Sequence, residues 1–340
     1  MKLQFLDLAA DERRLYIDQA ATQRNLSGVI LEKDFWVSWL LALLFNSEFA
    51  GSLVFKGGTS LSKVFGVIDR FSEDIDLSVS PEFLNLPVAG ASRNQANKWM
   101  QRAEAACSKA VETLIAPRLE QDVVAVLGEG DRTWFEFVTD PGTNSPVLLF
   151  HYPTTQPSGF DYLQRTVKLE FGSLTDQRPV GRHPVEPLLA DILPSAFADW
   201  QCEVVALELP RSFWEKATIL HAEYYRPAEK PTPDRFSRHY ADTAALAARP
   251  EAIHAVGQHD LRERVVAWKG QFFGSAWARY DLAQPGTFRL VPPENRVPGL
   301  RRDYEAMRDM YLAEPIDFDK VLAALGELEQ QINGADSSSA

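Results

Sequence analysis

The sequence predicts an α+β protein, with a mixed β-sheet and flanking helices followed by a mainly helical C-terminal domain. Two observations support this fold class. Short apolar segments bounded by turn residues alternate with segments of helical periodicity up to Pro184, and beyond it the pattern is almost entirely helical. We therefore predict a sheet-containing domain over residues 1–185, a helical domain over residues 186–333 and a disordered tail over residues 334–340.

The expected elements follow one another along the chain. Ser27 is a suitable N-cap for an apolar helix that extends to about Phe45, and Pro210 stands at the favoured first turn of a later helix. Strands are expected at residues 53–56, 74–79, 123–127, 133–139, 147–152, 164–171 and 203–207. Further helices are expected at residues 11–24, 59–65, 92–119 (with a break favoured at Pro117), 234–247, 260–272, 301–311 and 317–332.

Composition and cysteine usage limit the class of protein. A chain of 340 residues with 45% apolar content can bury a large core. Cys107 and Cys202 lie far apart without partners at metal-ligand spacing, which argues against disulfides and zinc and favours a reducing, cytoplasmic compartment. Residues 1–20 carry charges where a signal peptide needs an apolar stretch, and the longest apolar run, residues 35–45, is too short to cross a bilayer. We expect no membrane association.

The net charge bears on possible partners. A formal charge of −12 weighs against non-specific nucleic-acid binding through a global field. A local basic patch is one alternative, and a mixed solvated surface that also holds acidic residues is equally consistent with the sequence. The cations in question are Arg211, Lys216, Arg226, Lys230, Arg235 and Arg238.

The strongest chemical signal lies between Leu53 and Val79, which read LVFKGGTSLSKVFGVIDRFSEDIDLSV. Residues two apart in a strand project to the same face, so Asp74 and Asp76 are expected to point together while Ile75 points into the core. Two carboxylates on one face repel each other unless a cation lies between them. Oxygen ligands of this kind suit Mg²⁺, which completes its coordination with water and substrate phosphates.

A glycine turn precedes these acids and suits a phosphate group. Gly57 and Gly58 have no side chains and allow a triphosphate close to the backbone, Thr59 and Ser60 add hydroxyl groups, and Lys63 lies one helical turn further on. Each part alone is usually a simple turn or a solvated strand end. In this order, between two apolar strands, the parts indicate a nucleotidyltransferase site.

Further motifs extend the pattern along residues 31–246. The run FKGGTSLSKVFG followed by RFSEDIDLSV is preceded by LEKDFWVSWLLALLF and followed in order by VKLEFG, RSFWEKATILH and RFSRHYADTAAL. Together these motifs resemble the AbiEii/AbiGii toxin family, the nucleotidyltransferase-like toxins of type IV toxin–antitoxin and abortive-infection systems.

This resemblance implies a polymerase-beta-like fold and an NTP-dependent, pyrophosphate-releasing enzyme that uses Mg²⁺ or Mn²⁺. In family members of this type a nucleoside monophosphate is transferred to the 3′ end of tRNA, which blocks aminoacylation and growth and serves antiviral defence. A winged-helix antitoxin encoded nearby is the further partner that it implies. Two alternatives stay open: transfer to a protein or small molecule, and a nucleotide-binding or partner-binding module without catalysis.

The motifs also suggest roles for individual residues. The expected catalytic residues are Asp74, Asp76, Glu170, Lys216 and Asp242, of which Asp74, Asp76 and Glu170 are the expected metal ligands. The nucleotide is expected to contact Lys56, Gly57, Gly58, Thr59, Ser60, Lys63, Lys168 and Lys216. By the same resemblance, Ser72 is a candidate for regulatory phosphorylation.

Several of these residues have a simpler interpretation. Glu170 and Lys168 are expected to share one strand face, where they could equally form an edge-strand ion pair. The Lys216 ammonium lies on an apolar helix and needs a partner such as a phosphate, whereas Asp242 either orients Lys216 or is a surface acid. The run at residues 32–34, Glu-Lys-Asp, either braces the glycine turn or forms the polar stripe of an amphipathic helix, and the stripe is the favoured interpretation.

Overall fold

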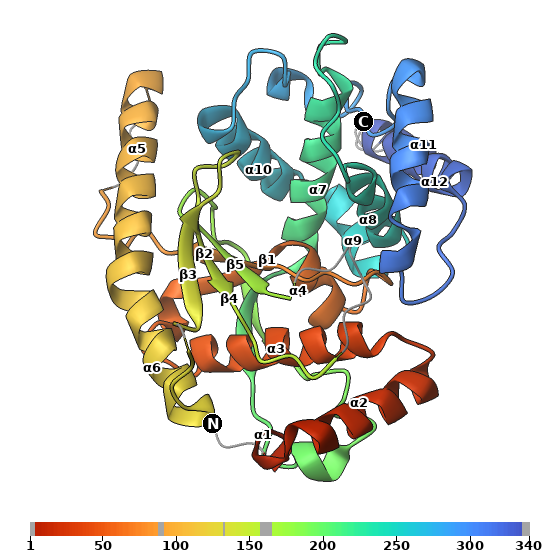
Figure 1. The fold of residues 1–340 in the computed structure, drawn as a ribbon. Helices are drawn as coiled ribbons and strands as arrows, with labels where there is room; N and C mark the ends of the chain where they lie inside the picture. Colours follow the sequence, from red (N-terminus) through yellow and green to blue (C-terminus); the bar gives the residue numbers. More distant parts are fainter. Residues whose placement is uncertain (1–3, 88–91, 132, 157–164, 335–340) are drawn as a thin grey trace. The chain divides into compact units, whose positions relative to one another are not determined.

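The computed structural model describes residues 4–87, 92–131, 133–156 and 165–334 (Figure 1). The chain divides into two compact units. Unit 1 consists of Met1–Val64, Ser72–Gly90 and Lys98–Ala206, and unit 2 consists of Phe65–Phe71, Ala91–Asn97 and Leu207–Ala340. The predicted domain boundary lies near residue 185, whereas unit 1 extends to Ala206. The difference arises because the last strand of the sheet lies after residue 185.

Within the described residues, seven strands form one mixed sheet in the order β3-β4-β5-β2-β1-β7-β6, and all of their residues except Leu207 belong to unit 1. The strands are β1 (Leu53–Lys56), β2 (Ile75–Val79), β3 (Phe135–Thr139), β4 (Pro146–Phe150), β5 (Val167–Gly172), β6 (Val180–Pro184) and β7 (Glu203–Leu207). Strands β1 and β2 are antiparallel, whereas β2 and β5 are parallel and β7 runs parallel to β1. The predicted mixed sheet is therefore confirmed.

The register of the three central strands aligns charged residues in one row. Lys56 of β1 pairs with Asp76 of β2, and Asp76 pairs with Glu170 of β5. Directly paired residues project to the same face of a sheet. The neighbouring positions, Ile75 and Leu77, are fully buried on the other face, as the alternation predicted.

Helices of unit 1 cover the sheet and supply most of its core. They are α1 (Gln4–Asp7), α2 (Ala10–Arg24), α3 (Gly28–Phe45), α4 (Gly57–Lys63), α5 (Arg93–Ala110) and α6 (Ala116–Leu127), and the first residues of α5 belong to unit 2. Helix α3 is buried on all sides, which explains why its apolar residues show no helical stripe. The Ser27 hydroxyl accepts a hydrogen bond from Val29 N and caps this helix as expected.

Two sequence-based assignments in unit 1 were wrong. Residues 123–127, predicted as a strand, form the end of α6, which follows α5 through a π-helical turn at Val111–Ile115 (Figure 1). Short apolar runs cannot be assigned to helix or strand by periodicity alone, and here Leu119 and Val123 face the core one turn apart. Strand β6 was missed because it is polar and largely exposed.

Unit 2 is mainly helical, as the sequence predicted. Its principal helices are α7 (Leu209–Tyr224), α8 (Ser237–Ala247), α9 (Pro250–His254), α10 (His259–Phe272), α11 (Val297–Ala306) and α12 (Phe318–Gly334). The predicted disordered tail, residues 334–340, lies outside the described residues apart from Gly334. No described helix is long and apolar enough to cross a membrane.

The segment Phe65–Phe71 belongs to unit 2, although it connects α4 to β2 of unit 1. It pairs with the chain after α11: Phe71 N donates to Met310 O at 2.7 Å, and Leu312 N donates to Asp69 O at 2.9 Å. These backbone contacts fix the segment to the helical unit.

Candidate active site

Strand β2 carries the carboxylate pair, with Asp76 in the middle of the row between Lys56 and Glu170. Asp76 is the second residue of the strand and Asp74 stands just before it, both half-buried. The pKa of Asp74 is raised to about 6, chiefly by burial and then by the neighbouring carboxylates of Asp76 and Glu73, while the charges of Lys168 and Lys33 act in the opposite direction. Asp74 therefore lies in a position where a negative charge is unfavourable unless a cation is bound.

The glycine turn is built against this pair. Gly57 has φ of +81°, and a β-carbon added to it would lie 2.0 Å from Asp76 Oδ2. Glycine is therefore required twice, by the backbone conformation and by the close approach of the carboxylate. Thr59 donates a hydrogen bond to the backbone carbonyl of Asp74, and its Oγ1 lies 2.9 Å from Ser72 Oγ. These contacts join the turn to the residues before β2.

Some of the residues predicted to contact the nucleotide in this turn are buried or already bound to other residues. Thr59 and Ser60 are fully buried, and the Thr59 hydroxyl already has a structural partner. Lys63 forms an ion pair with Asp34 at 2.5 Å, so its ammonium supports the fold. Phosphate contacts of Lys56, Gly57 and Gly58 stay a prediction.

The run of residues 32–34 is not a surface stripe, so the favoured interpretation was wrong. All three side chains are buried in α3. Asp34 accepts a hydrogen bond from Leu188 N at 2.6 Å in addition to its ion pair with Lys63 on α4, and Lys33 forms an ion pair with Glu73 beside Asp74. The helix therefore braces both the glycine turn and the carboxylate segment.

Lys168 and Glu170 share one face of β5, as predicted, and are bound to each other. Lys168 Nζ lies 2.9 Å from Glu170 Oε2 and 3.1 Å from Asp140 Oδ2. Burial alone would raise the pKa of Asp140, but hydrogen bonds from Lys168 Nζ and from the backbone of Thr143 and Gly142 lower it to about 2. Asp140 was missed by sequence reasoning, and the turn sequence DPGTNSP gave no signal of it.

The donor set suits a divalent cation held by two carboxylates. Within the described residues, no three His, Cys, Asp or Glu side chains are arranged around one metal position, and Glu170 is engaged by Lys168. Asp74 and Asp76 alone fit Mg²⁺, which usually takes one or two carboxylates and keeps water or phosphate oxygens in its other positions. The raised pKa of Asp74 is consistent with a site that is completed by a cation.

Unit 2 holds the other two expected catalytic residues, and they are in contact. Lys216 of α7 lies with its Nζ 2.8 Å from Asp242 Oδ2 of α8. Arg70 binds the same carboxylate with both arms, Nε to Oδ1 and Nη2 to Oδ2, each at 2.8 Å. His239 Nδ1 lies 3.4 Å from Lys216 Nζ. Asp242 is fully buried, so its interpretation as a surface acid was wrong.

Burial and charge act in opposite directions on this pair. Burial would raise the pKa of Asp242, but Arg70 and Lys216 hold it well below its usual range. The pKa of Lys216 is lowered because burial disfavours its charge more than Asp242 favours it. The role of Arg70 was not found from the sequence, because its partner Asp242 is 172 residues away.

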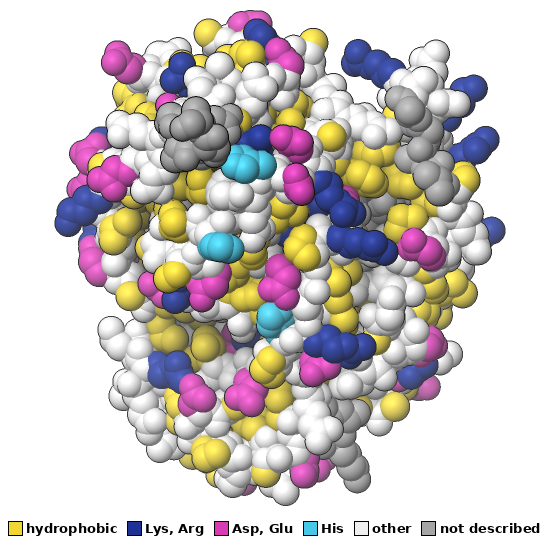
Figure 2. Space-filling view, turned by 180° about the vertical axis from the view of Figure 1, so that it is seen from behind, with side chains coloured by type: hydrophobic (Ala, Val, Ile, Leu, Met, Phe, Trp, Pro, Cys, Tyr) yellow, Lys and Arg dark blue, Asp and Glu magenta, His cyan; other side chains and the backbone are white. Residues whose placement is uncertain are grey.

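The cations expected to form a basic patch are largely engaged in ion pairs. Arg211 is fully buried and binds Glu215 at 2.6 Å, and Arg226 binds Glu223 at 2.6 Å. On the face shown in Figure 2, Lys and Arg side chains are interspersed with Asp and Glu. A mixed charged surface is therefore the better description of that face.

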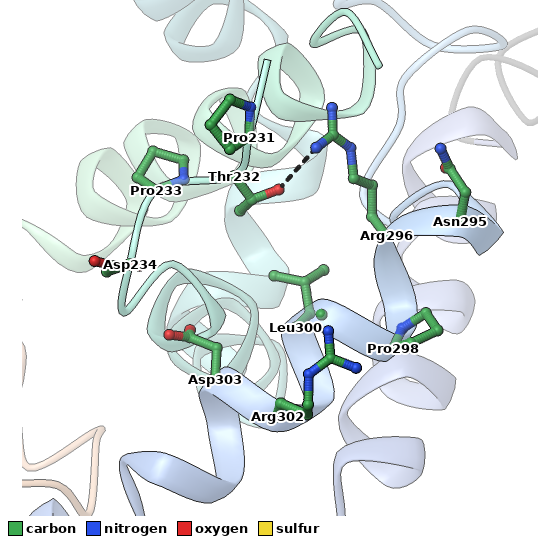
Figure 3. A pocket seen from close by; sticks show the side chains of 11 residues that line it. Pro231, Thr232, Pro233, Asp234, Asn295, Arg296, Pro298, Leu300, Arg302 and Asp303 are labelled. Atoms are coloured by element: carbon green, nitrogen blue, oxygen red, sulfur yellow. Dashed lines mark hydrogen bonds between the residues drawn. The ribbon is translucent and has the colours of Figure 1, made fainter. Parts of the chain in front are cut away.

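A separate pocket of about 370 Å³ lies in unit 2 between the loop at residues 231–234 and the start of α11 (Figure 3). Arg296 on its wall donates to Thr232 Oγ1 at 3.4 Å. The charged residues that line the pocket balance in sign, two arginines against two aspartates: Arg296, Arg302, Asp234 and Asp303. We do not assign the nucleotide to this pocket.

A mixed sheet that carries a carboxylate pair beside a glycine turn defines a nucleotidyltransferase. The family model for "Nucleotidyl transferase AbiEii toxin, Type IV TA system" matches residues 39–324. The chain belongs to this AbiEii family of nucleotidyltransferase toxins, as its motifs indicated. Membership implies an NTP as substrate, an antitoxin as partner and, as in the family generally, a divalent metal ion.

Other comparisons are more distant. Among solved structures, the chain is similar to MenT4, a nucleotidyltransferase toxin from Mycobacterium tuberculosis H37Rv, at 17% sequence identity and a TM-score of 0.45, over 96% of this chain and 98% of that chain. No curated protein matches the chain.

Proposed function

We propose that this toxin transfers a nucleoside monophosphate from an NTP to a hydroxyl at the 3′ end of tRNA and releases pyrophosphate. The observation that carries the chemistry is the carboxylate pair Asp74 and Asp76: burial first, and then repulsion from Asp76, raise the pKa of Asp74 to about 6, which favours binding of a cation. Blocked tRNA ends would stop aminoacylation and growth, which is the expected effect of such a toxin in defence against phage.

Asp74 and Asp76 are the residues that would hold the metal ion, for which Mg²⁺ or Mn²⁺ is proposed. A bound divalent ion supplies charge neutralisation for the triphosphate. Glu170 is proposed to accept the proton of the attacking hydroxyl, for which Lys168 would first have to release its carboxylate. The same release would free the Lys168 ammonium for a phosphate oxygen.

The remaining residues position the nucleotide. Gly57 and Gly58 present bare backbone to the triphosphate, and Lys56 on the same row as Asp76 is proposed to add a positive charge. In unit 2, the Lys216 ammonium is proposed to bind a phosphate oxygen, with Asp242 fixing its direction. Positioning and fixed charge are the main contributions that a protein makes to phosphoryl and nucleotidyl transfer.

The tRNA acceptor can be tested directly with the full-length protein. Purified protein would be incubated with Mg²⁺, each α-³²P-labelled NTP and total tRNA, and the products resolved on a denaturing gel. Label is expected on intact tRNA, and not on tRNA whose terminal ribose has been oxidised by periodate or with the Asp74→Asn/Asp76→Asn variant. Label that persists on oxidised tRNA would contradict transfer to the 3′ end.

A second candidate acceptor is a protein or a small molecule. The net charge of −12 and the interspersed surface charges favour it, because a tRNA substrate usually meets a basic surface. Label recovered in the protein or small-molecule fraction of a cell extract, with none in RNA, would establish this alternative.

Ser72 is proposed as a regulatory phosphorylation site. Its Oγ lies 2.9 Å from Thr59 Oγ1, and Thr59 in turn holds the backbone of Asp74. A phosphate group there adds close to two negative charges (about −1.5 to −2) beside the carboxylate pair and displaces this contact. Ser72→Asp is expected to lose transfer activity and Ser72→Ala to keep it; an active Ser72→Asp enzyme would count against the proposal.

The partner that controls the toxin is proposed to be a winged-helix antitoxin encoded nearby, and the compartment the cytoplasm. Both cysteines support a reducing compartment, because Cys107 and Cys202 are buried, unpaired thiols whose burial raises their pKa to about 12. Co-expression with the neighbouring gene, followed by a growth assay, tests the antitoxin.

A further inference from the structure

Lys216 has two hydrogen-bond partners within unit 2, and only one of them is charged. Its Nζ lies 2.8 Å from Asp242 Oδ2 and 3.4 Å from His239 Nδ1, both on α8. A lysine ammonium has three N–H donors. In the described part of the chain, the third N–H donor of Lys216 has no partner. The Lys216 side chain is 10% exposed, so it is largely buried.

His239 can accept a hydrogen bond at Nδ1 only when that nitrogen carries no proton. The surroundings of the ring keep it neutral. The pKa of His239 is held well below its ordinary value, chiefly by burial and then by the positive charges of Lys216, Arg238 and Arg70, with the charge of Asp242 acting in the opposite direction. A protonated ring would instead donate at Nδ1 and repel Lys216.

Arg70 completes the arrangement from the other side of the carboxylate. Its two-armed contact uses both oxygens of Asp242 and fixes the plane of the carboxylate. Oδ2 is thereby directed at Lys216, at 2.8 Å. The lysine is then held between an acceptor that cannot rotate and an imidazole that also accepts.

We propose that His239 is a positioning residue for Lys216: its neutral ring accepts a hydrogen bond at Nδ1 and, together with the Asp242 carboxylate fixed by Arg70, leaves one N–H of Lys216 available for a phosphate oxygen of the nucleotide. The identity of the ligand rests on the proposed function. The geometry of the lysine and its two acceptors does not depend on it.

A purely structural role for the ring is the competing explanation. His239 also packs against Phe236, with ring centroids 4.8 Å apart, and a packing role needs only the ring's shape. The two roles differ in which atom of the side chain matters. A packing role is indifferent to whether the Nδ1 position carries an acceptor.

Two matched variants separate these roles, because the amide of asparagine reaches the position of Nδ1 and the amide of glutamine reaches that of Nε2. With the full-length enzyme, His239→Asn is expected to keep the KM for NTP within about threefold of the wild type. His239→Gln is expected to raise it about tenfold or more, the usual effect of losing a hydrogen bond to a charged group. The exposed His254→Gln serves as control.

The comparison overturns the proposal if His239→Asn and His239→Gln raise KM equally, or if the loss appears in kcat with KM unchanged. Circular dichroism and thermal unfolding of each variant show whether it is folded, so a misfolded variant is recognised. If His239→Gln fails to fold, His239→Asn is compared with His239→Phe, which keeps the ring and removes the acceptor.

A second measurement does not require activity. Long-range ¹H–¹⁵N NMR spectra of the imidazole report which nitrogen carries the proton, and Lys216→Met identifies the signal that depends on the lysine. His239 is expected as the neutral form protonated at Nε2 at pH 7. A ring protonated at Nδ1 would refute the inference even in an active enzyme, whereas an inactive wild-type enzyme with the expected form would refute only the proposed function.

Discussion

In unit 1, carboxylates crowd around Asp74 and Asp76, whereas in unit 2 the cations Arg70 and Lys216 surround a single carboxylate, Asp242. The first cluster shifts the pKa of its central acid upward and the second shifts it downward. The difference is in what completes each cluster. The carboxylate pair is proposed to take a cation from outside the chain, while the cations of unit 2 are already fixed by a buried acid.

This comparison teaches how one enzyme meets a polyanionic substrate with an acidic chain. Repulsion at Asp74 and Asp76 favours the binding of a divalent ion, so in the proposed mechanism positive charge arrives together with the nucleotide. The Lys216 cluster instead carries its positive charge permanently and holds it in a defined direction. Neutral substitutions at Asp74 and Asp76 are therefore expected to abolish activity without destabilising the fold. Neutral substitutions in the Asp242 cluster are expected to reduce both activity and stability.

The largest effect is expected from removing both acids of the first cluster. The Asp74→Asn/Asp76→Asn enzyme is expected to lose nucleotidyl transfer by about 10⁴-fold or more, because no ligand for the cation is left. Its fold is expected to be intact and, without metal, at least as stable as the wild type. Transfer rates and chemical denaturation in EDTA measure the two quantities, with the exposed Glu82→Gln as control; a double variant that still transfers nucleotide would break the comparison.

Asp242→Asn is expected to have the opposite profile, with a large loss of stability. Removing the acid takes away the carboxylate that both buried cations, Arg70 and Lys216, bind, and breaking a buried ion pair costs about 3–5 kcal/mol in free energy of unfolding. Lys216→Met serves as the matched variant and is expected to cost less, since Asp242 keeps its two bonds to Arg70. Equal stabilities of the two variants in urea denaturation would show that Asp242 is not the residue on which both cations depend.

The pH dependence of stability is expected to have opposite signs in the two clusters. The pKa of Asp74 is raised from 3.8 to about 6, so the folded metal-free protein holds a proton that the unfolded chain releases. Its contribution is present below about pH 4 and is lost as the pH rises to about 6, a change of at most about 3 kcal/mol. The pKa of Asp242 is lowered, so its contribution is present above about pH 4 and is lost as the pH falls.

Unfolding free energies in EDTA from pH 3.5 to 7 test this difference. Asp74→Asn should remove the loss of stability between pH 4 and 6 and leave the acid limb in place. The raised pKa of Asp74 would be contradicted if the stability of the wild type did not change between pH 4 and 6, or if Asp74→Asn did not alter that change.

A smaller effect is expected at the glycine turn. Gly57→Ala places a methyl group 2.0 Å from Asp76 Oδ2, in addition to the cost of a positive φ. Gly66→Ala meets no atom within 4 Å and carries only the backbone cost, about 1 kcal/mol. Transfer activity should fall strongly in Gly57→Ala and little in Gly66→Ala; similar activities would show that the turn does not control the carboxylate.

The smallest effect is expected from Lys168→Met. Lys168 lowers the pKa of Asp74, so its loss should raise that pKa above about 6 and weaken metal binding at neutral pH. The change in stability is expected to stay below about 1 kcal/mol, because the lysine is partly exposed in its ion pairs. The pH dependence of metal binding measures the pKa of Asp74 in the wild type and in Lys168→Met. A lower pKa of Asp74 in the variant would contradict this prediction.

The local features of the fold could be predicted from the sequence because they depend on near neighbours. Alternation placed Ile75 and Leu77 in the core and Asp74 and Asp76 on the other face, and strand β7 was found at its observed position. The run VVAVL at residues 123–127 was wrongly assigned to a strand, because a buried helix end and a buried strand have the same apolar pattern.

The supporting contacts of the site could not be predicted, because they join residues far apart in the chain. Asp34 and Lys63 are 29 residues apart, and Arg70 and Asp242 are 172 apart. Which acid meets which base depends on the packing of whole elements. No local pattern distinguished these buried pairs from charges on a solvated surface.

The segment Phe65–Phe71 belongs to unit 2 but lies far from the main part of that unit in the sequence. The helical unit contains this short stretch, encoded between the glycine turn and Asp74, and it carries Arg70, the partner of Asp242. Recombination that exchanged everything after Ala206 as one cassette would leave Arg70 behind in the recipient gene. A cut after Ala206 therefore does not separate the two units, because Arg70 would be parted from its partner Asp242.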